Sequence, residues 1–176
     1  MQFKSFAYLL SAVAVVLAQS AQDVLSNLAT LRTQLTTLDG AINGFPDTGG
    51  SLTQALAIHT DALNVQSATD DTTAATSGTP PFSEADGQSV IDAVTGLVPI
   101  IEDALVGIVA KKPAFDALPL GGISDLVRQD LSGLSSSTSS LEDALIALAP
   151  ADLVDESTAL KNEVDAAFAT AIAAYN

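Results

Sequence analysis

Residues 24–45 read VLSNLATLRTQLTTLDGAINGF, and this stretch decides the fold class. Its apolar residues recur at alternating steps of four and three, which is the spacing of one face of an α-helix. We therefore predict an amphipathic helix of about twenty residues and about 30 Å, which ends at Gly44, Pro46 and the Gly49-Gly50 pair. The apolar stripe consists of Val24, Leu28, Leu31, Leu35, Leu38, Ile42 and Phe45.

A second helix is predicted to begin at Ser51. Ser51 and Gln54 have the spacing of a capping box, in which each side chain accepts a hydrogen bond from the other residue's backbone N–H. We expect Leu52, Leu56, Leu63 and several alanines to face the protein interior. The helix is expected to fray from Ser67 onwards.

Residues 67–81 are rich in Thr, Ser, Asp, Gly and Pro, and this composition predicts a surface loop. Two interpretations of the loop stay open. Its hydroxyl groups carry O-linked mannose or similar sugars, or it is a bare polar loop. The candidate hydroxyls belong to Thr69, Thr72, Thr73, Thr76, Ser77 and Thr79.

The third predicted helix has Ser83 as its N-cap and acidic residues in its first turn, where the helix dipole favours them. Gly96 and Pro99 interrupt its apolar stripe, so we expect a kink there. The Lys111-Lys112 pair closes the helix, and residues 113–122 form a turn region. The stripe consists of Val90, Val94, Leu97, Ile101, Leu105 and Ile108.

Two further helices complete the chain. The serine run 135–140 is predicted to be helical because the apolar stripe continues in phase across it, from Leu134 to Leu141. A fifth helix follows Pro150 and carries the stripe that ends at Tyr175. Short connections favour antiparallel neighbours, so the predicted fold is all-α, a five-helix antiparallel up-and-down bundle.

The N-terminus has the pattern of a signal peptide. Lys4 is the only charged residue before an apolar run from Phe6 to Leu17, and Ala18 provides a small residue for cleavage. The run is too short to predict a transmembrane segment, although an uncleaved anchor is the alternative. We predict a signal peptide over 1–18 and a single helical-bundle domain over 19–176, and hence a secreted, extracellular protein.

Charge and cysteine content exclude several classes of function. The net charge of −15 becomes −16 after cleavage, because Lys4 is the only charge removed. Such an acidic surface repels phosphate groups, so neither nucleic acid nor an anionic membrane is an expected partner. The chain has no cysteine, which excludes disulfides and thiol catalysis, so the domain must be held together by packing alone.

The sequence offers little for catalysis. The single histidine, His59, lies in the second predicted helix, and no Gly-x-Ser-x-Gly element is present. Acidic pairs such as Glu142-Asp143 point about 100° apart on a helix, so they cannot easily act together as acid and base. No acidic run has EF-hand spacing. We predict no enzyme activity, no cofactor and no metal site.

Binding of an apolar partner is the remaining candidate function. The chain is 48% apolar but only 5% aromatic, and smooth aliphatic faces suit a cavity for a hydrocarbon chain. A plain structural core is the competing interpretation, because helical apolar stripes are ordinarily core. The predicted cavity lining consists of Leu31, Leu35, Leu97, Ile101, Leu105, Leu134, Leu141, Val164 and Phe168.

Four segments of the chain resemble the fungal hydrophobic-surface-binding protein A family, which includes cell-wall galactomannoproteins. The resemblance extends from Gln22 to Tyr175, and none of its motifs is catalytic. The segments are LDGAINGF at 38–45, FSEAD at 82–86, LVGIVAKKPAF at 105–115 and VDAAFATAI at 164–172.

The family resemblance implies a fungal protein that is secreted or loosely associated with the cell wall. Some relatives enclose a fatty acid between their helices, and others adsorb to hydrophobic surfaces. We therefore expect a long-chain fatty acid or similar amphiphile as the partner. The alternatives are an interfacial protein that recruits hydrolases to a surface and a structural, antigenic mannoprotein. The sequence ends at Asn176 without a Ser/Thr-rich stalk, which favours release over covalent wall attachment.

Overall fold

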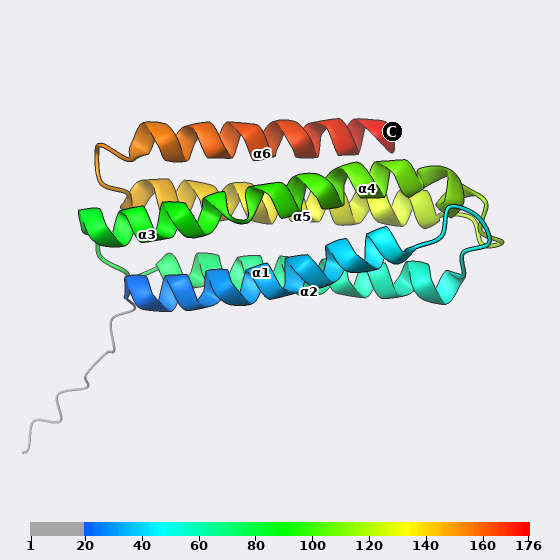
Figure 1. Ribbon diagram of the computed structural model, residues 1–176, viewed down its shortest axis with the longest axis horizontal. Helices are drawn as coiled ribbons and strands as arrows, with labels where there is room; N and C mark the ends of the chain where they lie inside the picture. The colour runs from blue at the N-terminus through cyan, green and yellow to red at the C-terminus, as the bar shows by residue number, and fades with distance from the viewer. Residues whose placement is uncertain (1–19) are drawn as a thin grey trace, which may run out of the picture.

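A computed structural model of the chain describes residues 20–176, and the predicted signal peptide lies outside the described residues. The described part is helical and contains no β-strand. Its helices are α1 (Ala21–Gly44), α2 (Leu52–Thr76), α3 (Glu84–Thr95), α4 (Val98–Asp116), α5 (Ile123–Leu148) and α6 (Val154–Ala174) (Figure 1).

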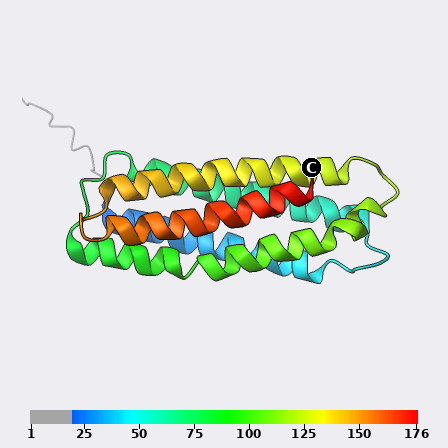
Figure 2. The same cartoon turned by 90° about the horizontal axis from the view of Figure 1, so that it is seen from above.

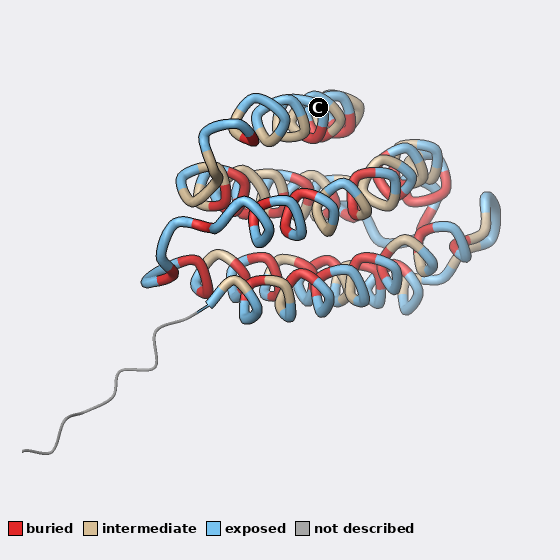
Figure 3. The backbone as a smooth tube through the Cα atoms, turned by 60° about the vertical axis from the view of Figure 1, so that its left-hand side comes forward, coloured by how far each residue is buried: buried red, intermediate tan, exposed pale blue. Residues whose placement is uncertain are grey.

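The helices form a bundle of five rods that run alternately in opposite directions, with α3 and α4 together making the third rod (Figure 1). The rods share one long axis (Figure 2). The main contacts are α1 with α2 and α4, α2 with α5, and α6 with α4 and α5. Buried residues lie on the sides where helices face one another (Figure 3). The predicted all-α antiparallel bundle is confirmed.

The predicted inner face of the first helix and its end at Gly44 are confirmed. Val24, Leu28 and Phe45 are almost fully buried, and so are the other members of the stripe. A capping box between Ser20 and Asp23 begins α1. Phe45 packs against another helix end, because its ring centroid lies 4.5 Å from that of Phe115.

The prediction of a surface loop over 67–81 is wrong for residues 67–76, because α2 continues as far as Thr76, and is confirmed only for residues 77–81. Thr69 and Thr72 are buried, and their hydroxyls donate hydrogen bonds of 2.8 and 2.6 Å to backbone carbonyls four residues earlier. The hydroxyl is thereby satisfied within the helix while the methyl group packs in the core. A threonine-rich composition therefore does not mark a loop here.

Burial also corrects the list of candidate glycosylation sites. Four of the six hydroxyls lie inside the bundle and cannot accept a sugar in the folded protein. These four belong to Thr69, Thr72, Thr76 and Thr79.

The predicted inner face of the second helix is partly wrong: alanines are buried and Leu52 packs against the core, as predicted, but two of the leucines point outward. Leu56 and Leu63 are 43% and 48% exposed. The face that packs against α1 and α5 is built of smaller residues. Both faces have helical spacing, so only the fit against the neighbouring helices decides which is buried. The buried residues of this face are Ala55, Ile58, Ala62, Val65 and Ala68.

The third rod is broken rather than kinked. Its helix stops after Thr95 and resumes at Val98. The Gly96 carbonyl accepts a 3.0 Å hydrogen bond from Arg32 Nη1 of α1, so the break is stabilised from outside the rod. Pro99 lies in the first turn of α4, where a helix has no use for the missing N–H. Pro99 therefore begins a helix instead of bending one.

The remaining helix limits follow the predictions with one correction. The Ser83 cap is confirmed, because its hydroxyl accepts a 3.2 Å hydrogen bond from the Asp86 N–H. The serine run 135–140 is helical within α5, as predicted. The turn predicted over 113–122 is too long, because α4 runs through Pro113 to Asp116. Burial of the adjacent Phe115 holds this last turn in place.

One stretch, Glu84–Asp116, is long and apolar enough to cross a membrane by length and composition alone. Core helices of soluble proteins share this property. Here the stretch is α3 and α4, which pack against α1 and α6. The absence of a transmembrane segment stays a prediction.

Candidate functional site

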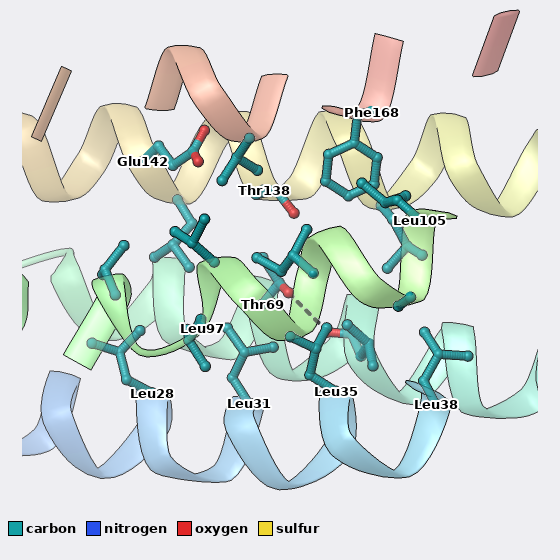
Figure 4. Close-up of a pocket in the computed structure, with 18 of the residues that line it drawn as sticks. Leu28, Leu31, Leu35, Leu38, Thr69, Leu97, Leu105, Thr138, Glu142 and Phe168 are labelled. Carbon is teal, nitrogen blue, oxygen red and sulfur yellow. Dashed lines mark hydrogen bonds between the residues drawn. The ribbon is translucent and has the colours of Figure 1, made fainter. Parts of the chain in front are cut away.

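A cavity of about 70 Å³ lies between the helices near the middle of the bundle. All five rods contribute to its wall. Leu28, Leu31, Leu35 and Leu38 point into it from α1, and Phe168 lies on the opposite wall (Figure 4). The wall is almost entirely aliphatic, so the cavity suits an apolar ligand.

The structure brings all nine predicted lining residues together around this one cavity. They come from α1, from the break before α4, and from α4, α5 and α6. That they contact a ligand stays a prediction. The nine residues are Leu31, Leu35, Leu97, Ile101, Leu105, Leu134, Leu141, Val164 and Phe168.

Sequence reasoning missed the contribution of α2 to the wall. Val65 and Thr69 line the cavity, but the predicted inner face of the second helix included neither residue, and the helix was expected to end too early. The four- and three-residue spacing of Ala55, Ile58, Ala62, Val65 and Thr69 would have found them if threonine had been counted as a core residue. Eight other lining residues were missed: Leu28, Leu38, Val94, Val98, Ala104, Thr138, Glu142 and Leu145.

Two smaller cavities continue the central one along the bundle. One, of about 50 Å³, shares Leu38, Ala104 and Leu134 with it and extends towards the start of α5. The other, of about 30 Å³, shares Val94 and Leu145 and extends towards the start of α6. The three cavities therefore lie one after another along the bundle, and only a few side chains separate each from the next.

Polar groups occur at one side of the central cavity. Thr138 and Glu142 lie one turn apart on α5 and face the same space (Figure 4). The Thr69 hydroxyl also borders it, but it donates its hydrogen bond to the Val65 carbonyl at 2.8 Å. Glu142 is the only charged residue in the wall of this cavity, and the sequence prediction did not include it.

Glu142 is buried and only weakly compensated. The residue is 9% exposed, and its Oε2 atom accepts no hydrogen bond from the described residues. Burial raises the pKa of Glu142 to about 7, although the positive charge of Lys161 acts in the opposite direction. The Lys161 Nζ atom lies 3.6 Å from Oε2, beyond the range of a good hydrogen bond.

His59 borders the 50 Å³ cavity and pairs with α5. Its Nδ1 atom lies 2.9 Å from Asp130 Oδ2. Burial raises the pKa of Asp130, while its hydrogen bond with His59 lowers it, and the net direction is upward. The pair ties α2 to α5 at the edge of the core.

The residues described, 20–176, bring no group of three His, Asp or Glu side chains into an arrangement that would hold a metal ion.

Comparison with known proteins gives matches at the level of family and of structure. The family described as hydrophobic surface binding protein A matches residues 21–147. The structure of Afmp4p in complex with palmitic acid is 38% identical, with a TM-score of 0.82, and the match covers 89% of this chain and 99% of that one.

More distant structures share the fold. Ligand binding domain 1 of the Penicillium marneffei MP1 protein, complexed with arachidonic acids, is 19% identical with a TM-score of 0.80, and the match covers 89% of this chain and 99% of that one. Ligand binding domain 2 of the same protein, complexed with multiple arachidonic acids, is 18% identical with a TM-score of 0.74, at 88% and 92% coverage. No curated protein gives a significant match.

Proposed function

Because the chain belongs to the hydrophobic surface binding protein A family, we propose that it is a non-catalytic protein that binds a long-chain fatty acid or similar amphiphile between its helices. The observation that carries this proposal is the aliphatic cavity that all five rods enclose. The likeness to Afmp4p, which was solved with palmitic acid, supports it at 38% identity.

The ligand-free cavities must join to hold a whole hydrocarbon chain. A water molecule needs about 10–15 Å³ of such volume, so the central cavity of about 70 Å³ has room for only a few waters. The two smaller spaces lie in line with it and are separated from it by side chains such as Leu38 and Leu145. Rotation of these side chains, with a small outward movement of the broken third rod, would form a continuous tunnel.

The free energy available from burying a chain is sufficient. Sixteen carbons at about 0.8 kcal/mol per methylene give roughly 12 kcal/mol before costs. Association and ordering oppose this by about 4 kcal/mol or more. Micromolar or tighter binding follows.

Secretion and a loose association with the cell wall belong to the same proposal. They rest on the signal-peptide pattern of residues 1–18 and on the family assignment. A released carrier of apolar molecules needs a soluble outer surface, and the strongly acidic composition provides one.

The binding proposal is tested by narrowing the passage between two cavities. Ala104 lies where the central cavity meets the 50 Å³ cavity. The variant Ala104→Leu is expected to stay folded, because its added atoms enter existing space, but to bind palmitate at least about tenfold more weakly. Ala169→Leu, on the exposed side of α6, is the matched control.

Native mass spectrometry of delipidated protein titrated with palmitate gives both stoichiometry and affinity. Binding of one or two palmitate molecules to the wild type and to Ala169→Leu, but not to Ala104→Leu, would support a tunnel. A protein that takes up no fatty acid of any chain length would end the proposal.

Adsorption to hydrophobic surfaces is a second candidate function, favoured by the exposed leucines of α2. Leu56 and Leu63 lie two turns apart on its outer face, at 43% and 48% exposure. Such adsorption would not depend on charge and should survive high salt. Less of the double variant Leu56→Ser, Leu63→Ser than of the wild type is expected to adsorb to hydrophobic beads, while its affinity for fatty acid is unchanged. Equal adsorption of the wild type and the double variant would show that this face of α2 is not the adsorbing surface.

A further inference from the structure

Glu142 is an unsatisfied hydrogen-bond acceptor in a cavity wall that is mostly apolar. It borders both the central cavity and the 30 Å³ cavity next to it. It is 9% exposed, and Oε2 has no hydrogen-bond partner among the described residues. A buried polar atom without a partner is costly, so this position calls for a donor that the folded protein itself does not provide.

Lys161 does not supply that donor, because its ammonium group is shared. Besides lying 3.6 Å from Glu142, it lies 3.5 Å from Asp143 and 3.3 Å from Asp165. It also donates a hydrogen bond to the Ser139 hydroxyl. One cation thus faces three carboxyl groups, two from α5 and one from α6. The charged groups that act on Glu142 are therefore Lys161, Asp143 and Asp165.

The charge balance decides in which form Glu142 meets an anion. When all three carboxyl groups are ionised, negative charge exceeds positive charge around Lys161. The carboxylate of an incoming fatty acid would then be repelled. A proton on Glu142 removes that repulsion and turns an acceptor into a donor. Burial already raises the pKa of Glu142 to about 7, and transfer of a fatty acid into an apolar cavity raises the pKa of its own carboxyl group for the same reason.

We propose that Glu142 and Lys161 form the head-group site of the cavity, where Glu142 and the carboxyl group of a fatty acid share one proton. This inference rests on the proposed function. The ligand carboxyl lies against Oε2 of Glu142, next to the ammonium group of Lys161, and the hydrocarbon chain extends from there between α1, α4 and α5. The two carboxyl groups titrate as a pair. When both are ionised before binding, formation of the complex takes up one proton from solvent.

A proton-linked head-group site makes fatty-acid binding dependent on pH. Above pH 7 each rise of one pH unit is expected to weaken binding about tenfold, because the complex needs one proton that the free partners have lost. An alcohol of equal chain length should behave differently. Its hydroxyl donates directly to ionised Glu142, so its affinity should not fall as the pH rises.

Calorimetry of the delipidated chain with dodecanoate and 1-dodecanol between pH 5.5 and 8.5 tests the site. Titration in two buffers of different ionisation enthalpy counts the protons taken up. The wild type should take up close to one proton with dodecanoate at pH 8, and none with the alcohol. Glu142→Gln mimics the protonated side chain, so it should bind dodecanoate without proton uptake and with little dependence on pH above 7. Glu163→Gln, an exposed change of equal charge on α6, should behave as wild type.

The possible failures are distinguishable. If neither ligand binds the wild type at any pH, the proposed function fails. If dodecanoate binds with the same pH profile in wild type and Glu142→Gln, or without proton uptake in the wild type, the head-group site is wrong while lipid binding stands. If Thr138→Val abolishes binding of dodecanoate at every pH and Glu142→Gln leaves the binding of dodecanoate unaltered, the head group lies at a hydroxyl instead. The number of protons taken up is measured on the wild type alone. The head-group proposal can therefore be refuted even if a variant folds poorly.

Discussion

The substitution Glu142→Gln is expected to stabilise the ligand-free protein at alkaline pH and to leave its stability nearly unchanged at acidic pH. Glu142 sits in the cavity wall with one oxygen unbonded and a single shared cation 3.6 Å away. Ionisation therefore places a poorly compensated charge inside the bundle. Glutamine keeps the shape of the side chain and removes that charge.

The magnitude follows from the pKa of this carboxyl group. Burial raises it from an ordinary value of 4.5 to about 7. Between these values the folded protein binds more protons than the unfolded chain, so stability falls as the pH rises through that window. A tenfold change in proton affinity is worth about 1.4 kcal/mol, so the loss is about 3 kcal/mol above pH 7 and close to zero below pH 4.5. Glutamine avoids this loss.

Thermal and urea unfolding at pH 4, 6 and 8 measure the effect. At pH 8 the melting temperature of Glu142→Gln should exceed that of wild type by roughly 6 to 12 °C, since 1 kcal/mol corresponds to about 2–4 °C for a chain of this size. Glu163→Gln on the exposed face of α6 is the matched control, because it changes the net charge equally without any burial. The difference between the two variants isolates the cavity carboxyl from the general charge of the acidic chain.

Two results would refute the reasoning. Equal gains in Glu142→Gln and Glu163→Gln at pH 8 would show that relief of overall negative charge, and not burial, is the cause. A loss of stability at pH 8 would show that the ion pair with Lys161 outweighs the burial of Glu142, since breaking a strong buried pair is destabilising.

Three further predictions concern the break in the third rod and the end of α2. Pro99→Ala should lower the free energy of unfolding by about 0.5–1 kcal/mol, because the proline fixes the first turn of α4. Arg32→Ala should cost about 1 kcal/mol in urea unfolding, because the Gly96 carbonyl loses its 3.0 Å hydrogen bond. Thr72→Ser should cost about 1 kcal/mol in thermal melts, because it removes one buried methyl group.

Each of these variants has a contrary outcome, and the last two also have a matched control. A more stable Pro99→Ala would mean that the proline bends a continuous helix after all. Arg128→Ala, at an exposed arginine whose Nη2 lies 3.7 Å from Asp125 Oδ1, should change stability by less than about 0.5 kcal/mol. If it matched Arg32→Ala, general charge would explain both. Asp71→Ser on the exposed side of α2 should be nearly neutral, and Thr72→Ser would match it only if this segment were a loop.

The sequence by itself determined the fold class, the polarity of the rods and about half of the residues that line the cavity. The stripe from Val24 to Phe45 has the period of a helix and cannot be buried by any other backbone geometry. Several such stripes separated by short polar connections predict an antiparallel bundle, because a short connection places successive helices side by side in opposite directions. The nine predicted lining residues come together because they lie on the inner stripes of successive helices, and those stripes must meet at the axis of the bundle.

Tertiary structure alone decided which of two possible faces α2 buries, where the third rod breaks, and what lies at the polar side of the cavity. Leu56 and Leu63 stay exposed because α1 and α5 pack against the other apolar face of α2, which carries Ile58 and several alanines. Threonine counts as polar in composition but behaves as a core residue once its hydroxyl bonds the preceding turn. The environment of Glu142 depends on a lysine nineteen positions away on the next helix. Periodicity specifies the face of one helix, whereas burial, charge and pKa depend on which faces meet, and only the packed bundle determines that.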